Sequence, residues 1–181
     1  RVVLAENRRA IEAQLTELAT LAAGERSRSN TAPAEARTFR INEDGTLAAG
    51  SAANPPLATS IISEWATADA QQGTPSPGFL GPTRQGSEWI VAVRAAQGAG
   101  WSVAYADLDR LLANARLGRL VSAGYDFALV QPDPNSTQPR VFVSAGSAPL
   151  DNPATAAIRP PIGYGKSNAG NFLDLALRPR D

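Results

Sequence analysis

The chain contains neither histidine nor cysteine among its 181 residues. Without them there is no Ser-His-Asp triad, no cysteine nucleophile, no disulfide and no zinc site built from the usual ligands. No imidazole is present to titrate near neutral pH either. Most hydrolase, transferase and metalloenzyme mechanisms are therefore excluded. We expect a chain that is not an enzyme, with no catalytic residue, no metal site and no cofactor.

Methionine is absent as well, which indicates a segment or processed product of a longer chain. No apolar run reaches the length of about 18 residues that a membrane-spanning helix needs. There is no signal-peptide pattern. The 17 basic and 17 acidic side chains balance. This balance gives no indication of nucleic acid as a partner.

Residues 4 to 23 predict a helix, because they are rich in good helix formers and Ile11, Leu15 and Leu18 recur at helical spacing. Gly24 is placed to end this helix. Two roles remain open for its apolar stripe. It packs on its own domain, or it pairs with a second copy as a short coiled coil, although Arg8 on the stripe weakens the second alternative.

The rest of the first half predicts a strand, a turn and a second helix. Residues 37–42 alternate polar and apolar side chains, and residues 43–46 form a turn with Asp-Gly at its centre. Residues 46–49 predict a weaker return strand. Asn54 is placed to cap a helix whose apolar face includes Trp65. Residues 73–86 have the composition of a loop.

The second half is richer in strands. We expect strands at 88–94, 101–106, 125–130, 140–144 and 172–177, a helix at 108–121, a short helix at 152–158 and an irregular loop at 159–170. Hairpins flanked by helices predict an α+β fold in which 88–94, 101–106, 125–130 and 172–177 share one antiparallel sheet. The length predicts one domain, residues 1–181, with a leading helix at 1–24 and the α+β core at 37–181.

Three short motifs resemble functional sites but lack required residues. The run ending Gly165-Lys166-Ser167 has Pro160 where a phosphate-binding loop needs glycine. Residues 133–137 open like a calcium loop, but the later glycine and glutamate are missing. Asp107 and Asp109 are explained by capping a helix. None of the three predicts a site.

A set of aromatic and charged residues on the predicted strands gives the candidate ligand-binding site: Trp89, Arg94, Trp101, Tyr105 and Tyr125. Tyrosine and tryptophan combine an apolar body with a polar tip, which suits a ligand pocket or a hydrophobic core equally. Arg94 lies in an otherwise apolar strand and needs a partner, for which a bound anion is one candidate.

Four segments carry a resemblance to a known family: WSVAYADLDRLL at 101–112, GYDFAL at 124–129, RVFVS at 140–144 and LDLALRPR at 173–180. In these segments the chain resembles the extracytoplasmic CHASE-type sensor domains of bacterial signalling proteins, within the wider class of PAS-like Cache sensors. The similarity covers roughly residues 88 to 181. The first half agrees only in architecture, with a long helix followed by an Asp-Gly hairpin.

The resemblance implies a PAS-like central antiparallel sheet of about five to six strands with a long N-terminal helix. It also implies a periplasmic domain between two membrane helices of an inner-membrane protein. Such a domain senses a small molecule or a periplasmic protein and controls a cytoplasmic cyclic-di-GMP synthase, phosphodiesterase or kinase. A homodimer through the N-terminal helix is expected. The alternative is a non-catalytic carbohydrate- or peptide-binding module of an exported protein.

Overall fold

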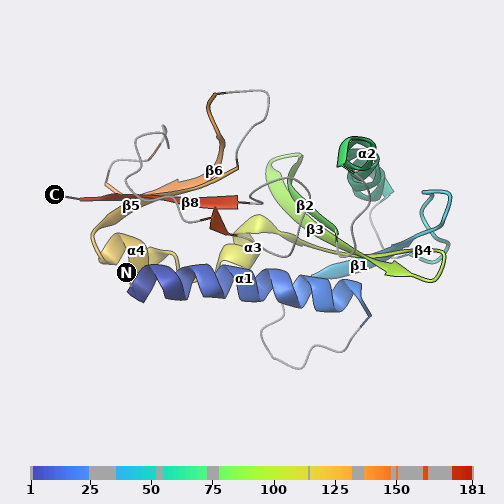
Figure 1. The fold of residues 1–181 in the computed structure, drawn as a ribbon, viewed down its shortest axis with the longest axis horizontal. Helices are drawn as coiled ribbons and strands as arrows, with labels where there is room; N and C mark the ends of the chain where they lie inside the picture. Colours follow the sequence, from blue (N-terminus) through green and yellow to red (C-terminus); the bar gives the residue numbers. More distant parts are fainter. Residues whose placement is uncertain are drawn as a thin grey trace. The chain divides into compact units, whose positions relative to one another are not determined.

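The computed structural model describes residues 2–24, 36–51, 55–72, 78–113, 115–131, 137–147, 150, 161–162 and 173–180. The predicted α+β class is confirmed, with antiparallel sheets and a long N-terminal helix, α1 (Val2–Ala22) (Figure 1). The chain divides into two compact units, where its length predicted one domain. We call them the sheet A unit (Ala13–Leu111 and Gly165–Ala169) and the sheet B unit (Arg1–Glu12, Leu112–Tyr164 and Gly170–Asp181).

The prediction of one sheet shared by residues 88–94, 101–106, 125–130 and 172–177 is wrong, because these strands belong to two sheets. Sheet A has the order β1 (Arg37–Ile41), β4 (Gly100–Asp107), β3 (Glu88–Gln97), β2 (Gly78–Gln85). Sheet B has the order β6 (Arg140–Ala145), β5 (Tyr125–Gln131), β8 (Leu173–Pro179), β7 (Pro161–Ile162). All described pairings are antiparallel. Alternation along a strand indicates which side chains face a core, and it does not choose the neighbouring strand.

β2 lies within the segment 73–86, which the sequence predicted as loop. Its pairing with β3 shifts register between Leu80 and Thr83, and Pro82 lies at that irregularity. Proline has no N–H to donate, so sheets accept it at edge strands and bulges. β2 is one of the two edge strands of sheet A. The glycines and the proline of this segment gave it the composition of a loop, although residues 78–85 form a strand.

The helix predicted at 108–121 is two short helices, α3 (Leu108–Ala113) and α4 (Gly118–Ser122). Arg116 between them has φ of 50°, which an α-helix does not allow. The turn is held from α1, where the Asn7 Nδ2 donates to the carbonyl oxygens of Ala115 (2.6 Å) and Arg116 (3.1 Å). The helix predicted at 152–158, and most of the loop at 159–170 with Lys166, lie outside the described residues.

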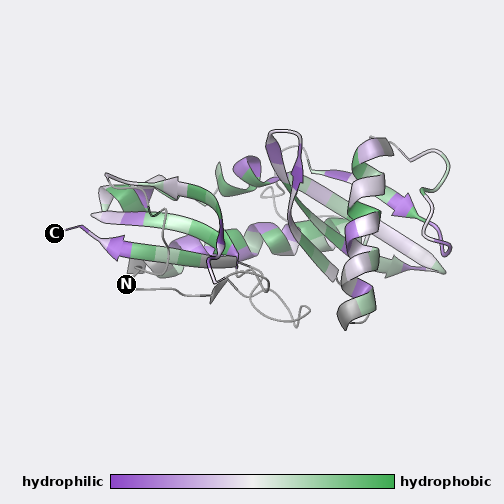
Figure 2. Ribbon diagram, turned by 90° about the horizontal axis from the view of Figure 1, so that it is seen from above, coloured by the Kyte–Doolittle hydropathy of each residue, from purple (hydrophilic) through white to green (hydrophobic). Residues whose placement is uncertain are grey.

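The core of the sheet A unit lies between sheet A and α2 (Pro55–Gln72). Ala58, Ile61 and Trp65 recur at helical spacing on α2 and are buried against Val103 and Tyr105 of β4. The central strands of the sheets carry continuous hydrophobic stretches, while α2 has both hydrophobic and hydrophilic residues (Figure 2). The predicted second helix is confirmed, while its expected cap, Asn54, lies outside the described residues.

The apolar stripe of α1 packs within the chain, as the first of the two alternatives has it. Ile11, Leu15 and Leu18 are completely buried. Gly24 ends the helix as predicted, with φ of 73° and its N–H donating to the Leu21 carbonyl at 3.0 Å. The described exposed positions of α1 are small or polar: Ala5, Glu6, Arg9, Ala13 and Thr16. The stripe that suggested a coiled coil is thus already occupied.

The Asp-Gly turn after β1 is confirmed. Gly45 has φ of 80°, and the Asp44 Oδ1 accepts hydrogen bonds from the Thr46 hydroxyl (2.6 Å) and the Thr46 N–H (2.9 Å). These bonds favour the carboxylate and lower the pKa of Asp44, the hydroxyl contributing most. The predicted return strand at 46–49 is reduced to one bridge between Ile41 and Leu47.

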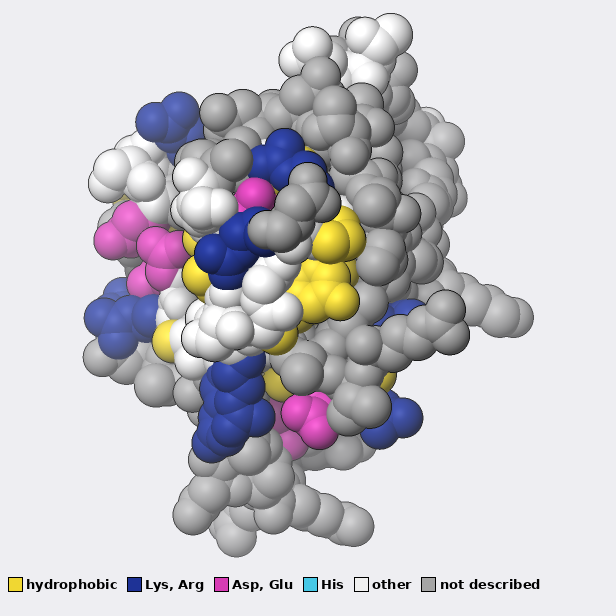
Figure 3. Space-filling view, turned by 90° about the vertical axis from the view of Figure 1, so that its left-hand side faces the viewer, with side chains coloured by type: hydrophobic (Ala, Val, Ile, Leu, Met, Phe, Trp, Pro, Cys, Tyr) yellow, Lys and Arg dark blue, Asp and Glu magenta, His cyan; other side chains and the backbone are white. Residues whose placement is uncertain are grey.

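Asp126 on β5 is the charged group at the centre of the sheet B unit, with a side chain only 3% exposed. Its Oδ2 lies 3.0 Å from the Arg178 Nη2, and its Oδ1 lies 3.8 Å from the Arg180 Nε. Oδ1 also accepts from the Ser147 N–H at 2.9 Å. On the face drawn in Figure 3, carboxylate and arginine side chains lie next to one another around hydrophobic ones. We call Asp126, Ser147, Arg178 and Arg180 the Asp126 cluster.

We expect Gly146→Ala to destabilise the sheet B unit by about 3 kcal/mol, because it adds backbone strain and a steric clash. Gly146 has φ of 138°, and a Cβ there would lie 2.8 Å from the Asp126 Cα and closer still to its carboxylate. Gly45→Ala is the matched control, since Gly45 also has positive φ but nothing within 4 Å of an added Cβ. Urea unfolding followed by circular dichroism measures both. Equal costs for the two variants would contradict the clash.

Candidate functional site

The candidate site is centred on Arg94, which enters the core between sheet A and α2. Period-two alternation puts Arg94 on the same face of β3 as Ile90 and Ala92, the face that α2 covers. Its cross-strand neighbour on β4 is Val103. The small side chain of Ala92 and the absence of a side chain at Gly78, opposite Arg94 on β2, leave room for the long arginine.

The Arg94 guanidinium lies between two tryptophan rings. Its central carbon is 5.0 Å from the ring centroid of Trp65 on α2 and 4.6 Å from that of Trp101 on β4. Both distances are within the range of attractive cation–π contacts, each contributing about 0.5–2 kcal/mol depending on desolvation. The guanidinium is therefore fixed by aromatic surfaces from the helix and from the sheet.

The partner that Arg94 required is Asp69, one helical turn after Trp65 on α2. The Arg94 Nη2 donates to the Asp69 Oδ1 in an ion pair, with side chains 5% and 22% exposed respectively. A side chain of this protein thus supplies the anion that the sequence left unidentified. Removing two charges from water costs free energy, and this cost offsets much of their attraction. A buried ion pair is therefore weak evidence that its role is to stabilise the fold.

Three buried polar groups in this core have no hydrogen-bond partner in the structure: the Arg94 Nε, the Trp65 Nε1 and the Tyr105 hydroxyl. All three can donate a proton, and Asp69 is the one carboxylate that Arg94 contacts among the described residues. Buried donors without acceptors are rare in folded proteins. The region is therefore short of hydrogen-bond acceptors. A molecule that carries acceptor oxygens would satisfy these groups.

A cavity of about 180 Å³ lies beside Tyr105 at the other end of the same face. Leu57 and Ile90 form its apolar wall, and Glu88 and Asp107 contribute carboxylates. Its volume is below the range of about 300–1,000 Å³ typical of sites for drug-sized ligands. It adds space near Tyr105 and is not a full-sized pocket by itself.

The structure brings together three of the five predicted site residues. Arg94, Trp101 and Tyr105 lie on the face of sheet A that α2 covers. Trp89 lies on the opposite face by alternation along β3, and its ring is 6.0 Å from the Arg84 guanidinium. Tyr125 is on β5 in the sheet B unit. We therefore leave Trp89 and Tyr125 out of the site.

Sequence reasoning missed Trp65 and Asp69. The four-residue spacing between them puts both on one face of α2, and that face continues through Ile61 and Ala58. An aspartate on an apolar helix face is a signal of a buried charge partner. It could have been read together with Arg94, since each is the unusual charged residue of its own apolar face.

Metal-ligating side chains do not gather in the part of the chain that the structure describes. Within it, no group of three or more His, Cys, Asp or Glu side chains could hold a metal ion. None of its helices combines the length and apolar character needed to cross a membrane. Asp107 lies 3.5 Å from Arg110 in an i,i+3 ion pair, in agreement with a role at the start of α3.

The chain has no match among family models, curated proteins or solved structures. The site therefore has to be interpreted from its own geometry. That geometry is a buried, aromatic-flanked arginine with one carboxylate partner and unpaired donors around it.

Proposed function

We propose that this chain is a periplasmic sensory domain of a membrane-bound signalling protein, and that it binds a small molecule at the Arg94 site. In the parent protein it would control a cytoplasmic cyclic-di-GMP synthase, phosphodiesterase or kinase. The resemblance of residues 88 to 181 to CHASE-type sensors suggests this role. The proposal does not include catalysis, because the chain has neither a histidine nor a cysteine to serve as base or nucleophile.

The observation that carries the proposal is the Arg94 guanidinium between Trp65 and Trp101, with unpaired donors around it. The enclosure of the aromatic rings supports a sensor over the alternative, a carbohydrate-binding surface. Trp65 is 2% exposed and Tyr105 is 4% exposed. A surface that binds carbohydrate would present its rings as a flat, exposed row.

A ligand at this site would change how α2 packs on sheet A, because Trp65 and Asp69 are both on α2. A ligand oxygen that accepts from Arg94 competes with Asp69 for the same guanidinium. Weakening the Arg94–Asp69 pair would loosen the last turns of the helix. A ligand can shift a conformational equilibrium only through such a difference in affinity between two states.

A homodimer through α1 remains part of the proposal, although it has to use the polar face of the helix. The exposed positions Ala5, Arg9 and Ala13 are small or charged. Such a face lets helices approach closely without the strong apolar seam of a coiled coil. Weak, concentration-dependent association is the form of dimer that it supports.

The test is a thermal-shift screen of small organic acids, neutral polar metabolites and amines, followed by calorimetry on each compound that raises Tm. We expect compounds with acceptor oxygens to bind, and Arg94→Gln to weaken them at least about tenfold through loss of a charge-assisted hydrogen bond. Trp101→Leu should weaken the same compounds, because it removes one ring from the guanidinium.

Arg84→Gln is the matched control, since Arg84 makes a comparable contact with Trp89 outside the site. It should leave ligand affinity unchanged. A ligand that binds equally well to all of these variants would show that the site is elsewhere. If no compound in the three classes raises Tm, the small-molecule form of the proposal is contradicted and recognition of a protein partner takes its place.

A further inference from the structure

A second cavity, of about 520 Å³, lies on the opposite face of sheet A from α2 and is not part of the Arg94 site. Its volume is within the range typical of ligand pockets. It is bounded by β1, by the segment Ala48–Ser51, by the C-terminal end of α1 and by Gln97 at the end of β3. Its lining is neutral except for Arg40, with hydroxyl groups from Thr38, Ser51 and Ser102.

The cavity runs along the outer edge of β1, which is an edge strand of sheet A. The outer edge is partly covered at Arg40, where the N–H donates to the Ser51 Oγ (3.2 Å) and the carbonyl accepts from the Ala48 N–H (2.9 Å). The main-chain groups of Arg40 therefore point away from β4. The segment after the Asp-Gly turn thus forms hydrogen bonds with the outer edge of β1 at Arg40.

Thr38 presents the same pair of groups, and among the described residues none covers them. The β1–β4 ladder has no register shift, so residues two apart on β1 point the same way and the Thr38 N–H and C=O also face outward. No described residue donates to or accepts from them. Thr38 lines the cavity directly. A main-chain donor and acceptor with the spacing of an open β-strand therefore belong to a residue that lines the cavity.

We propose that this cavity binds a short extended peptide, which adds a strand to the edge of β1 at Thr38. A peptide supplies the acceptor and donor that an open strand requires, which is the basis of β-strand addition. Arg40, the one charged residue of the lining, selects an acidic side chain next to the paired residue. The small residues Ala48, Ala49 and Gly50 leave space for the other side chains of the peptide.

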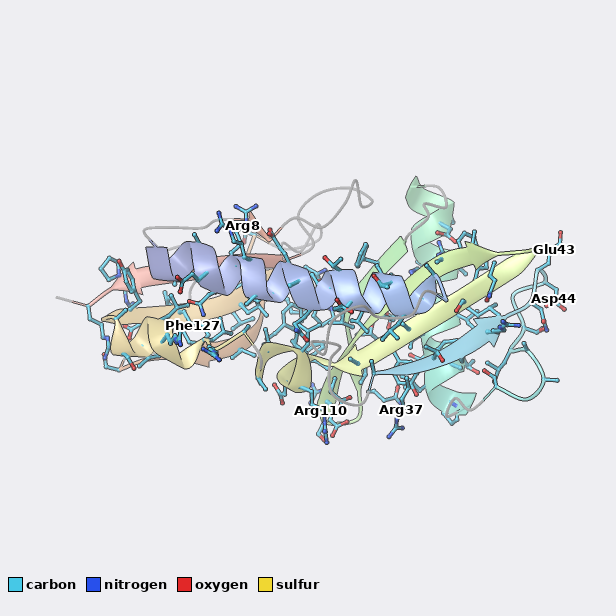
Figure 4. All side chains as sticks on the ribbon, turned by 90° about the horizontal axis from the view of Figure 1, so that it is seen from below. Arg8, Arg37, Glu43, Asp44, Arg110 and Phe127 are labelled. Carbon is cyan, nitrogen blue, oxygen red and sulfur yellow. The ribbon has the colours of Figure 1, made fainter. Side chains whose placement is uncertain are left out.

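Figure 4 shows β1 at the border of its sheet, with Arg37 projecting outward from its first residue and Glu43 and Asp44 at the turn beyond its end. The two acidic residues are not part of the cavity lining. They therefore do not neutralise Arg40 within the cavity, and the selectivity for an acidic peptide remains.

The decisive variant is Thr38→Pro, tested on the full 181-residue chain. Proline removes the outward N–H, which is not part of the β1–β4 ladder, and edge strands tolerate proline at such positions. Thr38→Val is the matched control, because it keeps the N–H and the β-branched shape and removes only the hydroxyl. The probe is a pool of acetylated, amidated pentapeptides with glutamate fixed at the second position. Enriched peptides are read by affinity selection and mass spectrometry.

We expect peptides to be enriched, and Thr38→Pro to weaken them about tenfold or more, while Thr38→Val leaves them within about twofold. Methylating the central peptide nitrogen should abolish binding, since it removes the donor to Thr38. Ala49→Trp fills the cavity and is the second test should Thr38→Pro lower Tm. Three results would each overturn the proposal: no enrichment over Ala49→Trp, binding that survives N-methylation, or selection of oligosaccharides from a glycan array in place of peptides.

Discussion

Arg94→Met is expected to destabilise the sheet A unit by about 3 kcal/mol, because it leaves the Asp69 carboxylate without its partner. This is the lower end of the range for breaking a buried pair, since the Asp69 side chain is 22% exposed and can still reach water. The two cation–π contacts are lost as well, although a methionine between two rings recovers part of that attraction.

The double variant Arg94→Met/Asp69→Leu completes the test. Replacing both charges by apolar side chains removes the unpaired carboxylate, so we expect about 2 kcal/mol of the loss to return. The three tryptophans at 65, 89 and 101 all lie in the sheet A unit, so their fluorescence during urea unfolding reports that unit alone. A single variant that costs less than about 1 kcal/mol, or a double variant no more stable than the single one, would contradict a coupled pair.

Asp126→Ala is expected to cost about 3 kcal/mol in the sheet B unit, because it removes the acceptor of the Ser147 N–H and the counter-charge of Arg178. Arg178 and Arg180 are each about a third exposed, so water compensates part of the loss of charge. Ser147 is exposed as well, so the cost comes mainly from the buried position of the Asp126 carboxylate. Hydrogen exchange of the β5 and β8 amides measures the effect, and faster exchange is expected there.

Asp109→Ala is the control, since Asp109 is an exposed aspartate in the first turn of α3. Its loss should change stability by no more than about 0.5 kcal/mol. Equal exchange rates in Asp126→Ala and Asp109→Ala would show that the Asp126 cluster does not stabilise the sheet B unit.

The edges of this fold are where sequence patterns were least informative. β2 was predicted as loop because glycine and proline normally interrupt regular structure. As an edge strand with a register shift between Leu80 and Thr83, it tolerates Pro82 where a central strand would not. The helix predicted at 108–121 fails at Arg116, because Asn7 binds the carbonyls of the turn from a segment 108 residues away. A pattern of neighbouring residues in the sequence contains no information about such a long-range contact.

Part of the candidate site was accessible from sequence alone. Arg94, Trp101 and Tyr105 share the buried face of sheet A because alternation along two adjacent strands fixes it. The same alternation puts Trp89 on the other face of β3. Trp89 is excluded from the site because the structure shows that α2 covers the face of Arg94. Trp65 and Asp69 were missed because the helix that carries them is joined to the site only by packing.

The sequence by itself determined the α+β class, the long first helix, most strands and the absence of histidine and cysteine chemistry. These follow from composition and short-range periodicity, which depend on neighbouring residues. Only the tertiary structure decided that the strands form two sheets, that Asp69 is the partner of Arg94, and that the outer edge of β1 borders a cavity. Strand neighbours, buried charge pairs and open edges depend on contacts between segments far apart in the chain, and local periodicity contains no information about them.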